Sequence, residues 1–259
     1  MAISKRNDTA WDNVASVSGV AKASVANVIG VAAPSGSSDI VIRDVTTSVY
    51  DEDSGSVSSI TVNLPSAGDG DFVIVILGFD WINSTDVVTT PSGWTRFLGP
   101  LGTDVSDAQI YAYYRAYTDT ASSTEAFAIN SNLGNRGAIA WSFITENIDT
   151  SDPVGNTGSA VAAASSVTAP AVTATKAGTF FNVVAFDGSY GDPFSFSNSS
   201  FTMTVLTQLD APSGGDANSH ISGAVAHANI GAGVSTNTTV VTAQASDGIL
   251  GVTFVLNRA

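Results

Sequence analysis

Short apolar or alternating runs recur along most of the chain and are separated by turn-forming residues. Alternation gives a strand one buried and one exposed face, and regular turn signals between short strands are typical of antiparallel sandwiches. No long amphipathic helix is visible in the sequence. The pattern therefore predicts an all-β fold, an antiparallel β-sandwich. The expected strands are residues 40–49, 57–64, 71–79, 94–98, 108–117, 124–130, 137–146, 179–187, 201–209, 219–228, 238–245 and 248–257.

Two of these strands are expected at the centre of the core. Residues 72–77 are apolar at every position, which predicts a central strand buried on both faces. Residues 249–256 carry apolar side chains at alternate positions, and we expect this strand to be locked into the core. The side chains on its buried face are Leu250, Val252, Phe254 and Leu256. Residues 159–175, rich in alanine, serine, threonine and valine, fit either a strand or a loose connection.

The first 35 residues differ from the rest in charge and in repeat pattern. They hold three basic against two acidic side chains, a local balance of +1, which leaves −15 for residues 36–259. The eleven-residue unit VASVSGVAKAS, Val14 to Ser24, is repeated as VANVIGVAAPS, Val25 to Ser35, with seven identical positions. Residues 34–38 have the small-residue composition of a linker. The chain is therefore predicted to divide into a docking segment, residues 1–35, and a sandwich domain, residues 36–259.

The valines of this repeat recur every three residues, which gives one apolar stripe if the segment is helical. Gly19 and Gly30 can then end each turn in the left-handed conformation, so the pattern predicts two short helical turns. Two repeats are too few to bury a core of their own. The apolar side chains therefore need a partner surface, either the main domain or another chain. The candidate docking residues are Trp11, Val14, Val17, Val20, Val25, Val28 and Val31.

The charge balance excludes several classes of partner. Nine basic against 23 acidic residues give a formal net charge of −14, which repels phosphate backbones and anionic headgroups. No apolar run approaches the roughly 20 residues that span a bilayer, and the first residues lack the apolar stretch of a secretion signal. We therefore expect a soluble protein with no nucleic-acid partner and no membrane insertion. The absence of cysteine removes disulfides, thiolate metal sites and cysteine nucleophiles.

The motifs of common catalytic and metal sites are missing from the sequence. It contains neither a phosphate-cradling loop with glycine before lysine nor a serine flanked by glycines two residues away on each side. His220 and His227 are seven residues apart in an expected strand, an odd offset that points them to opposite faces. The acidic groups at 51–53 and 69–71 fit turn chemistry better than a calcium loop. The sequence thus predicts a non-enzymatic protein with no cofactor and no metal, and a glycan hydrolase using two of its carboxylates is the remaining enzymatic alternative.

The strand expected at 108–117 carries several tyrosines on one face. One set of alternating side chains, Ile110, Ala112, Tyr114 and Ala116, suits a core. The opposite set is Tyr111, Tyr113, Arg115 and, at the end, Tyr117. Tyrosine and arginine are enriched at protein interfaces and sugar-stacking sites. This tyrosine face is therefore a candidate contact surface, unless a second sheet covers it.

Two stretches of the chain resemble tailed-bacteriophage virion structural proteins. The first, Trp11–Val20 with its echo Val25–Val31, looks like the tryptophan-led, Gly-Val-punctuated segment near the start of many such proteins. The second is similar to a jelly-roll-like sandwich module of phage tail and decoration proteins. It comprises Gly70–Val75, Pro91–Thr95 and Tyr113–Ala116.

The resemblance implies an assembly role with no catalytic motif. It implies that the N-terminal segment docks on a neighbouring virion protein while a jelly-roll-like β-sandwich faces outward. We therefore expect a tail-associated fibre or adhesin component, located in the virion after assembly in the host cytoplasm. Its expected partners are other virion proteins, further copies of itself as a homo-oligomer, and a host-surface glycan. A capsid decoration protein and a carbohydrate-binding module are the alternatives.

Overall fold

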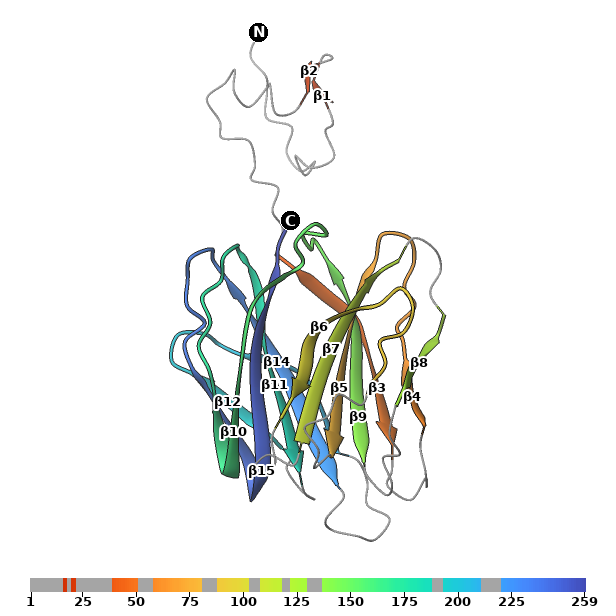
Figure 1. The fold of residues 1–259 in the computed structure, drawn as a ribbon. Helices are drawn as coiled ribbons and strands as arrows, with labels where there is room; N and C mark the ends of the chain where they lie inside the picture. The colour runs from red at the N-terminus through yellow and green to blue at the C-terminus, as the bar shows by residue number, and fades with distance from the viewer. Residues whose placement is uncertain are drawn as a thin grey trace. The chain divides into compact units, whose positions relative to one another are not determined.

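A computed structural model describes most of the chain from Asp39 onward (Figure 1). The described residues are 16–17, 20–21, 39–50, 58–80, 88–102, 108–117, 122–129, 137–187, 193–210 and 220–259. No helix occurs among them, and therefore none that could cross a membrane. The N-terminal residues and the body that begins at Asp39 form separate units.

The described N-terminal residues form a short antiparallel pair. β1 (Ser16–Val17) pairs with β2 (Val20–Ala21), with Val17 opposite Val20. The expectation of a helical turn at this point is therefore wrong. Valine is β-branched and favours strands over helical turns. Of the candidate docking residues, Trp11, Val14, Val25, Val28 and Val31 lie outside the described residues, so docking stays a prediction.

The body contains two large antiparallel sheets. The first has the strand order β3 (Val41–Tyr50), β9 (Ala138–Glu146), β5 (Phe72–Asp80), β7 (Ala108–Ala116), β6 (Thr95–Leu101). The second has the order β10 (Val154–Ala169), β15 (Thr239–Asn257), β11 (Gly178–Asp187), β14 (Ile221–Ile230), β13 (Thr204–Asp210), and β12 (Ser195–Asn198) also pairs with β15. A further pair joins β4 (Ser59–Asn63) to β8 (Thr124–Ala128). The fold class is therefore all-β, antiparallel and sandwich-like, as the pattern predicts.

The main core lies between the two large sheets. Phe143 of the first sheet stacks on Phe181 of the second at 5.6 Å between ring centroids, and Phe181 stacks on Phe254 at 5.0 Å. Residues 72–77 are buried throughout, which confirms the expected central strand. The four apolar side chains predicted for the C-terminal strand are fully buried in this core as well.

A close approach between the sheets depends on a glycine. A Cβ atom at Gly223 would lie 2.7 Å from Cη2 of Trp141 and 2.4 Å from the carbonyl oxygen of Val184. Only glycine leaves room for the indole here, which fixes Trp141 of the first sheet against β14 of the second.

Each large sheet has a second core on its outer face. β4 and β8 cover the first sheet, where Ile60, Val62 and Phe127 pack on Val75 and Leu77. On the second sheet, β10 and β15 bend near the register shift between Ala164 and Ser166 and turn back over their own sheet. Their outer parts and β12 then enclose a smaller core. Four layers result where a simple sandwich has two.

The second half of the body repeats the topology of the first. In chain order, β3, β5, β6, β7 and β9 correspond to β10, β11, β13, β14 and the C-terminal part of β15, and every pairing among the first set recurs in the second. The outer pair recurs too, because Ser166–Ala169 pairs with Thr239–Thr242 as β4 pairs with β8. The body therefore consists of two halves with one strand plan, packed face to face.

The expected strands agree with this architecture, with three differences. Of the segment 159–175, which fits either a strand or a loose connection, residues 159–169 belong to β10 and residues 170–175 lie outside the named strands. β12 was not predicted. The runs at 238–245 and 248–257 belong to one long strand, β15.

Candidate functional site

The tyrosine face of β7 is buried beneath the outer strands β4 and β8. Tyr111 and Tyr113 are fully buried, and Tyr117 is 3% exposed. The ring of Tyr113 lies 4.9 Å from that of Phe127 on β8. The candidate contact surface at Tyr111, Tyr113 and Tyr117 is therefore wrong, and the alternative that a second sheet covers this face is confirmed. Alternation located the face correctly, but a face covered by another sheet has the same pattern as an exposed binding face.

Arg115, the fourth member of that face, connects the two layers. Its guanidinium carbon lies 4.5 Å above the ring centroid of Tyr117, and Nη1 is 3.7 Å from Oε2 of Glu125 on β8. The same Glu125 oxygen accepts a hydrogen bond of 3.0 Å from Nε1 of Trp94. Trp94 is itself only 6% exposed. This arrangement fixes β8 to the first sheet and leaves no flat aromatic ring open for sugar stacking at these positions.

The open edge of β4 is covered by hydroxyl groups from β3. The hydroxyl of Tyr50 donates to the carbonyl of Thr61 and accepts from its amide. At Asn63, the amide donates to Oγ of Ser48 at 2.8 Å, and the carbonyl accepts from Oγ1 of Thr46 at 2.8 Å. These side chains occupy backbone groups that would otherwise pair with another strand. The edge of this outer pair is thus closed.

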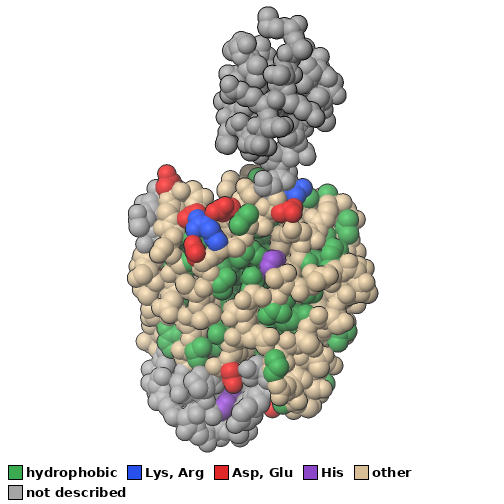
Figure 2. All heavy atoms as spheres, turned by 180° about the vertical axis from the view of Figure 1, so that it is seen from behind, with side chains coloured by type: hydrophobic (Ala, Val, Ile, Leu, Met, Phe, Trp, Pro, Cys, Tyr) green, Lys and Arg blue, Asp and Glu red, His purple; other side chains and the backbone are tan. Residues whose placement is uncertain are grey.

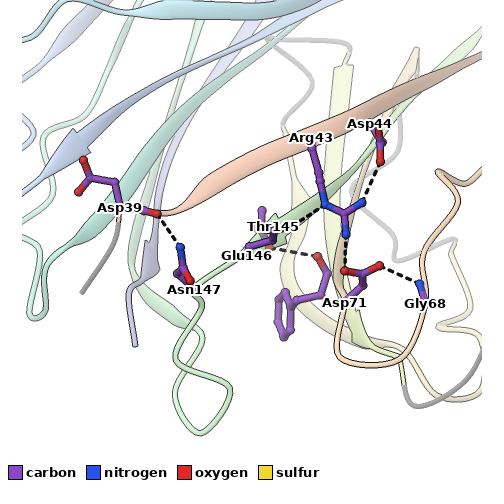
Figure 3. A network of polar contacts seen from close by, with 9 residues as sticks. Asp39, Arg43, Asp44, Gly68, Asp71, Thr145, Glu146 and Asn147 are labelled. Atoms are coloured by element: carbon purple, nitrogen blue, oxygen red, sulfur yellow. Dashed lines mark hydrogen bonds and ion pairs between the residues drawn. The ribbon is translucent and has the colours of Figure 1, made fainter. Parts of the chain in front are cut away.

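The densest charged cluster surrounds Arg43 on β3 (Figure 3). Its Nε donates to Glu146 at 2.6 Å, Nη1 to Asp44 at 2.9 Å and Nη2 to Asp71 at 2.5 Å. Hydrogen bonding to Glu146, and then to Asp44, raises the pKa of Arg43 above its ordinary value. Asp71 also accepts the amide of Gly68 at 2.7 Å, which is the turn chemistry expected at 69–71. The permanently charged guanidinium thus holds three carboxylates from β3, from the turn before β5 and from the end of β9.

A neighbouring set of contacts ties down the start of the body. Asn147 donates from Nδ2 to the carbonyl of Asp39 at 3.0 Å, which Figure 3 shows beside the Arg43 cluster. The carboxylate of Asp39 accepts from Nη1 of Arg258 at 2.8 Å. The first described residue of the body is therefore clamped to a β9–β10 turn and to the C-terminus.

Lys176 forms a second ion-pair cluster in the second half of the body. Its Nζ lies 2.6 Å from Asp149 and 2.9 Å from Asp152. Hydrogen bonds from Lys176 and then Ser151 lower the pKa of Asp149 below its ordinary value. Hydrogen bonding to Asp149 and Asp152 raises the pKa of Lys176. The cluster joins the turn before β10 to the turn before β11.

The two histidines do not form a joint site. His227 on β14 lies against the ring of Phe181 at 5.8 Å, and its burial lowers its pKa. His220 precedes the same strand and is 5% exposed. Within the described ranges, no three metal-ligating side chains come together. The acidic residues 51–53 lie outside these ranges.

Charged side chains are sparse on the body's surface. In the reverse view of Figure 2, most of them gather toward one end, and uncharged polar and hydrophobic groups cover most of the rest. Sequence reasoning did not single out Arg43, Lys176 or Glu125 as cluster centres. The scarcity of basic residues could have indicated them. With nine basic and 23 acidic side chains, a basic side chain is expected to contact more than one carboxylate.

Comparison with known proteins identifies no relative. No family model, no curated protein and no solved structure matches this chain.

Proposed function

We propose that this protein is a non-enzymatic structural component of a tailed-phage virion, a tail-associated fibre or adhesin that docks through its N-terminal segment. The resemblance at Trp11–Val20 and Val25–Val31 supports this assignment. The observation that carries it is the contrast between two parts of the chain. A repetitive, valine-rich segment precedes a body whose charged clusters, among the described residues, hold strands and turns together.

Apolar burial favours the docking of a segment of this kind. Burying Trp11 and six valines at about 1.5–3 kcal/mol each gives roughly 10–20 kcal/mol, which is comparable with the cost of association. The contacts of Asp39 with Asn147 and Arg258 fix the first described residue of the body. The docked N-terminal segment would then attach the folded body to the neighbouring virion protein. Oligomerisation fits the symmetric assemblies in which such proteins act.

The test uses particles that carry an altered leader. We expect the change of Trp11 to alanine together with Val17 and Val28 to aspartate to leave the body folded by circular dichroism but to prevent its incorporation into particles. The matched control is Val240→Asp, at a residue of the body that is 40% exposed. Normal incorporation of the leader variant would contradict the proposal.

A capsid decoration protein is the alternative within the same class. Immunogold labelling of intact particles separates the two assignments, because a tail component labels the tail and a decoration protein labels the head.

A further inference from the structure

Most edges of the sheets in the described body carry a device that prevents pairing with another strand. β3 holds the charges of Arg43 and Asp44 and bulges there, with Asp44 at φ 52°. β6 contains Pro100 and two register shifts, and β13 has a register shift after Val205. β12 has only four residues. Charge, proline, bulges and shortness are the means by which proteins protect sheet edges.

β10 differs from these edges. It is 16 residues long and contains no charged residue and no proline. Its pairing with β15 is regular from Thr157 to Ala164, with no bulge. Figure 1 shows β10, in green, at the margin of its sheet beside β15. Its counterpart in the first half is β3, so the same position is blocked in one half and left open in the other.

The direction of the backbone groups on β10 follows from its neighbour. The amide of Asn257 donates to Pro153 at 2.9 Å and its carbonyl accepts from Asp149 at 3.0 Å, so Asn257 faces the β10 side. Backbone groups alternate along a strand, so β15 residues 253, 251 and 249 face β10 as well. Their register partners are Gly158, Ala160 and Ala162. The residues between, including Ser159, Val161 and Ala163, direct their amides and carbonyls away from the sheet.

The outward amides and carbonyls of Thr157–Ala164 have no hydrogen-bond partner in the described part of the chain. The hydrogen bonds that this segment forms there are those of its ladder with β15. Ser159 and Ala163 are exposed, and the side chains along this stretch are small. The edge therefore offers a regular row of donors and acceptors about eight residues long.

We propose that Thr157–Ala164 of β10 pairs antiparallel with the same segment of a second copy of this chain, which joins two sheets across a two-fold axis. Self-complementarity favours a second copy as the occupant, because antiparallel pairing centred on Val161 brings outward-facing residues with small side chains opposite one another. Each chain carries a net charge of −14 and repels its copy, but this uncharged strand places no like charges opposite one another at the seam. Antiparallel pairing of a strand with itself satisfies the same groups on both copies. This segment shares no residue with the N-terminal leader, so either proposal can fail alone.

The test places charges on the open edge of the full chain. Ser159 and Ala163 face one side of β10, and pairing centred on Val161 sets Ser159 of one copy beside Ala163 of the other. We expect the native chain to sediment near twice 26.3 kDa and S159K/A163K to sediment as a monomer. Mixing S159K/A163K with S159E/A163E should restore the dimer, because the seam then carries opposite charges. The matched control, V45K/V49K on the blocked edge β3, should stay dimeric.

Amide hydrogen exchange gives a second readout that does not depend on mass. The amides of Ser159, Val161 and Ala163 should exchange slowly in the native chain and at least ten-fold faster in S159K/A163K. Those of Ala160 and Ala162, bonded to β15, should remain slow in both. A monomeric native chain, an oligomer that S159K/A163K leaves intact, or unprotected Ser159, Val161 and Ala163 amides in the native dimer would each overturn the proposal.

Discussion

Replacing Tyr113 by alanine tests whether the tyrosine face belongs to the core. Tyr113 is fully buried, and its ring lies 4.9 Å from Phe127 and 6.5 Å from Tyr111. Truncating a buried aromatic side chain removes its transfer free energy and leaves a cavity, which costs about 3–5 kcal/mol. Domains are stable by about 5–15 kcal/mol, so the variant should lose much of its stability.

Urea unfolding followed by tryptophan fluorescence measures this loss. Tyr113→Phe keeps the ring against Phe127 and should cost much less than Tyr113→Ala. Val205→Ala, at a side chain 41% exposed, should change the free energy of unfolding by no more than about 0.5 kcal/mol. If Tyr113→Ala changes the free energy of unfolding as little as Val205→Ala does, Tyr113 does not stabilise the core. The tyrosine face would then again be a candidate contact surface.

Three further predictions concern other parts of the body. A chain that ends at Asp247 should be insoluble or lack a cooperative unfolding transition, because it loses the part of β15 between β10 and β11; a soluble, cooperatively folded product would contradict this. Tyr50→Phe should lower the free energy of unfolding in urea by about 0.5–1.5 kcal/mol, since Thr61 on the edge of β4 loses its hydroxyl partner; an unchanged value would show that water replaces the hydroxyl fully. The lowered pKa of Asp149 beside Lys176 means that its stabilising contribution is present above its ordinary pKa of 3.8 and is lost as the pH falls below that value. Asp149→Asn should therefore flatten the acid side of a plot of melting temperature against pH, and parallel curves for variant and native chain would count against the ion pair.

The strands could be predicted because burial leaves a period of two in the sequence. β5 and the C-terminal part of β15 each lie between two neighbouring strands of their sheets. Both faces of β5 are apolar and one face of β15 is strongly so, and these strands give the clearest signals. β10 was ambiguous because an edge strand of small residues is neither apolar nor alternating. β12 is too short to show any period.

The contacts of each face could not be predicted from the same signal. Period-two alternation predicts which face of a strand is apolar, but it does not predict which element covers that face. The tyrosines of β7 and the apolar side chains at alternate positions of 250–256 in β15 give equally good patterns. Only the fold shows that the tyrosines meet β8 and that the β15 side chains meet the opposite sheet. The ion pairs of Arg43 with Asp71 and Glu146 join residues far apart in sequence, which no local pattern encodes.

The two halves of the body share a strand plan but no visible sequence repeat, because their outer layers require side chains of different volume. Phe79-Asp80 at the end of β5 matches Phe186-Asp187 at the end of β11, and in the registers that follow, Tyr111 and Tyr113 occupy the places of Ala224 and Ala226. The alternation is preserved, but side-chain volume is not. In the first half, separate outer strands stand off from the sheet and large rings fill the space. In the second, β10 and β15 fold back so that Val167 lies near Gly251, and small side chains stand at 224 and 226 where the first half has tyrosines. Because each half balances side-chain volume against the distance to its own outer layer, a residue exchanged between matching positions would leave a cavity in one half and overpack the other.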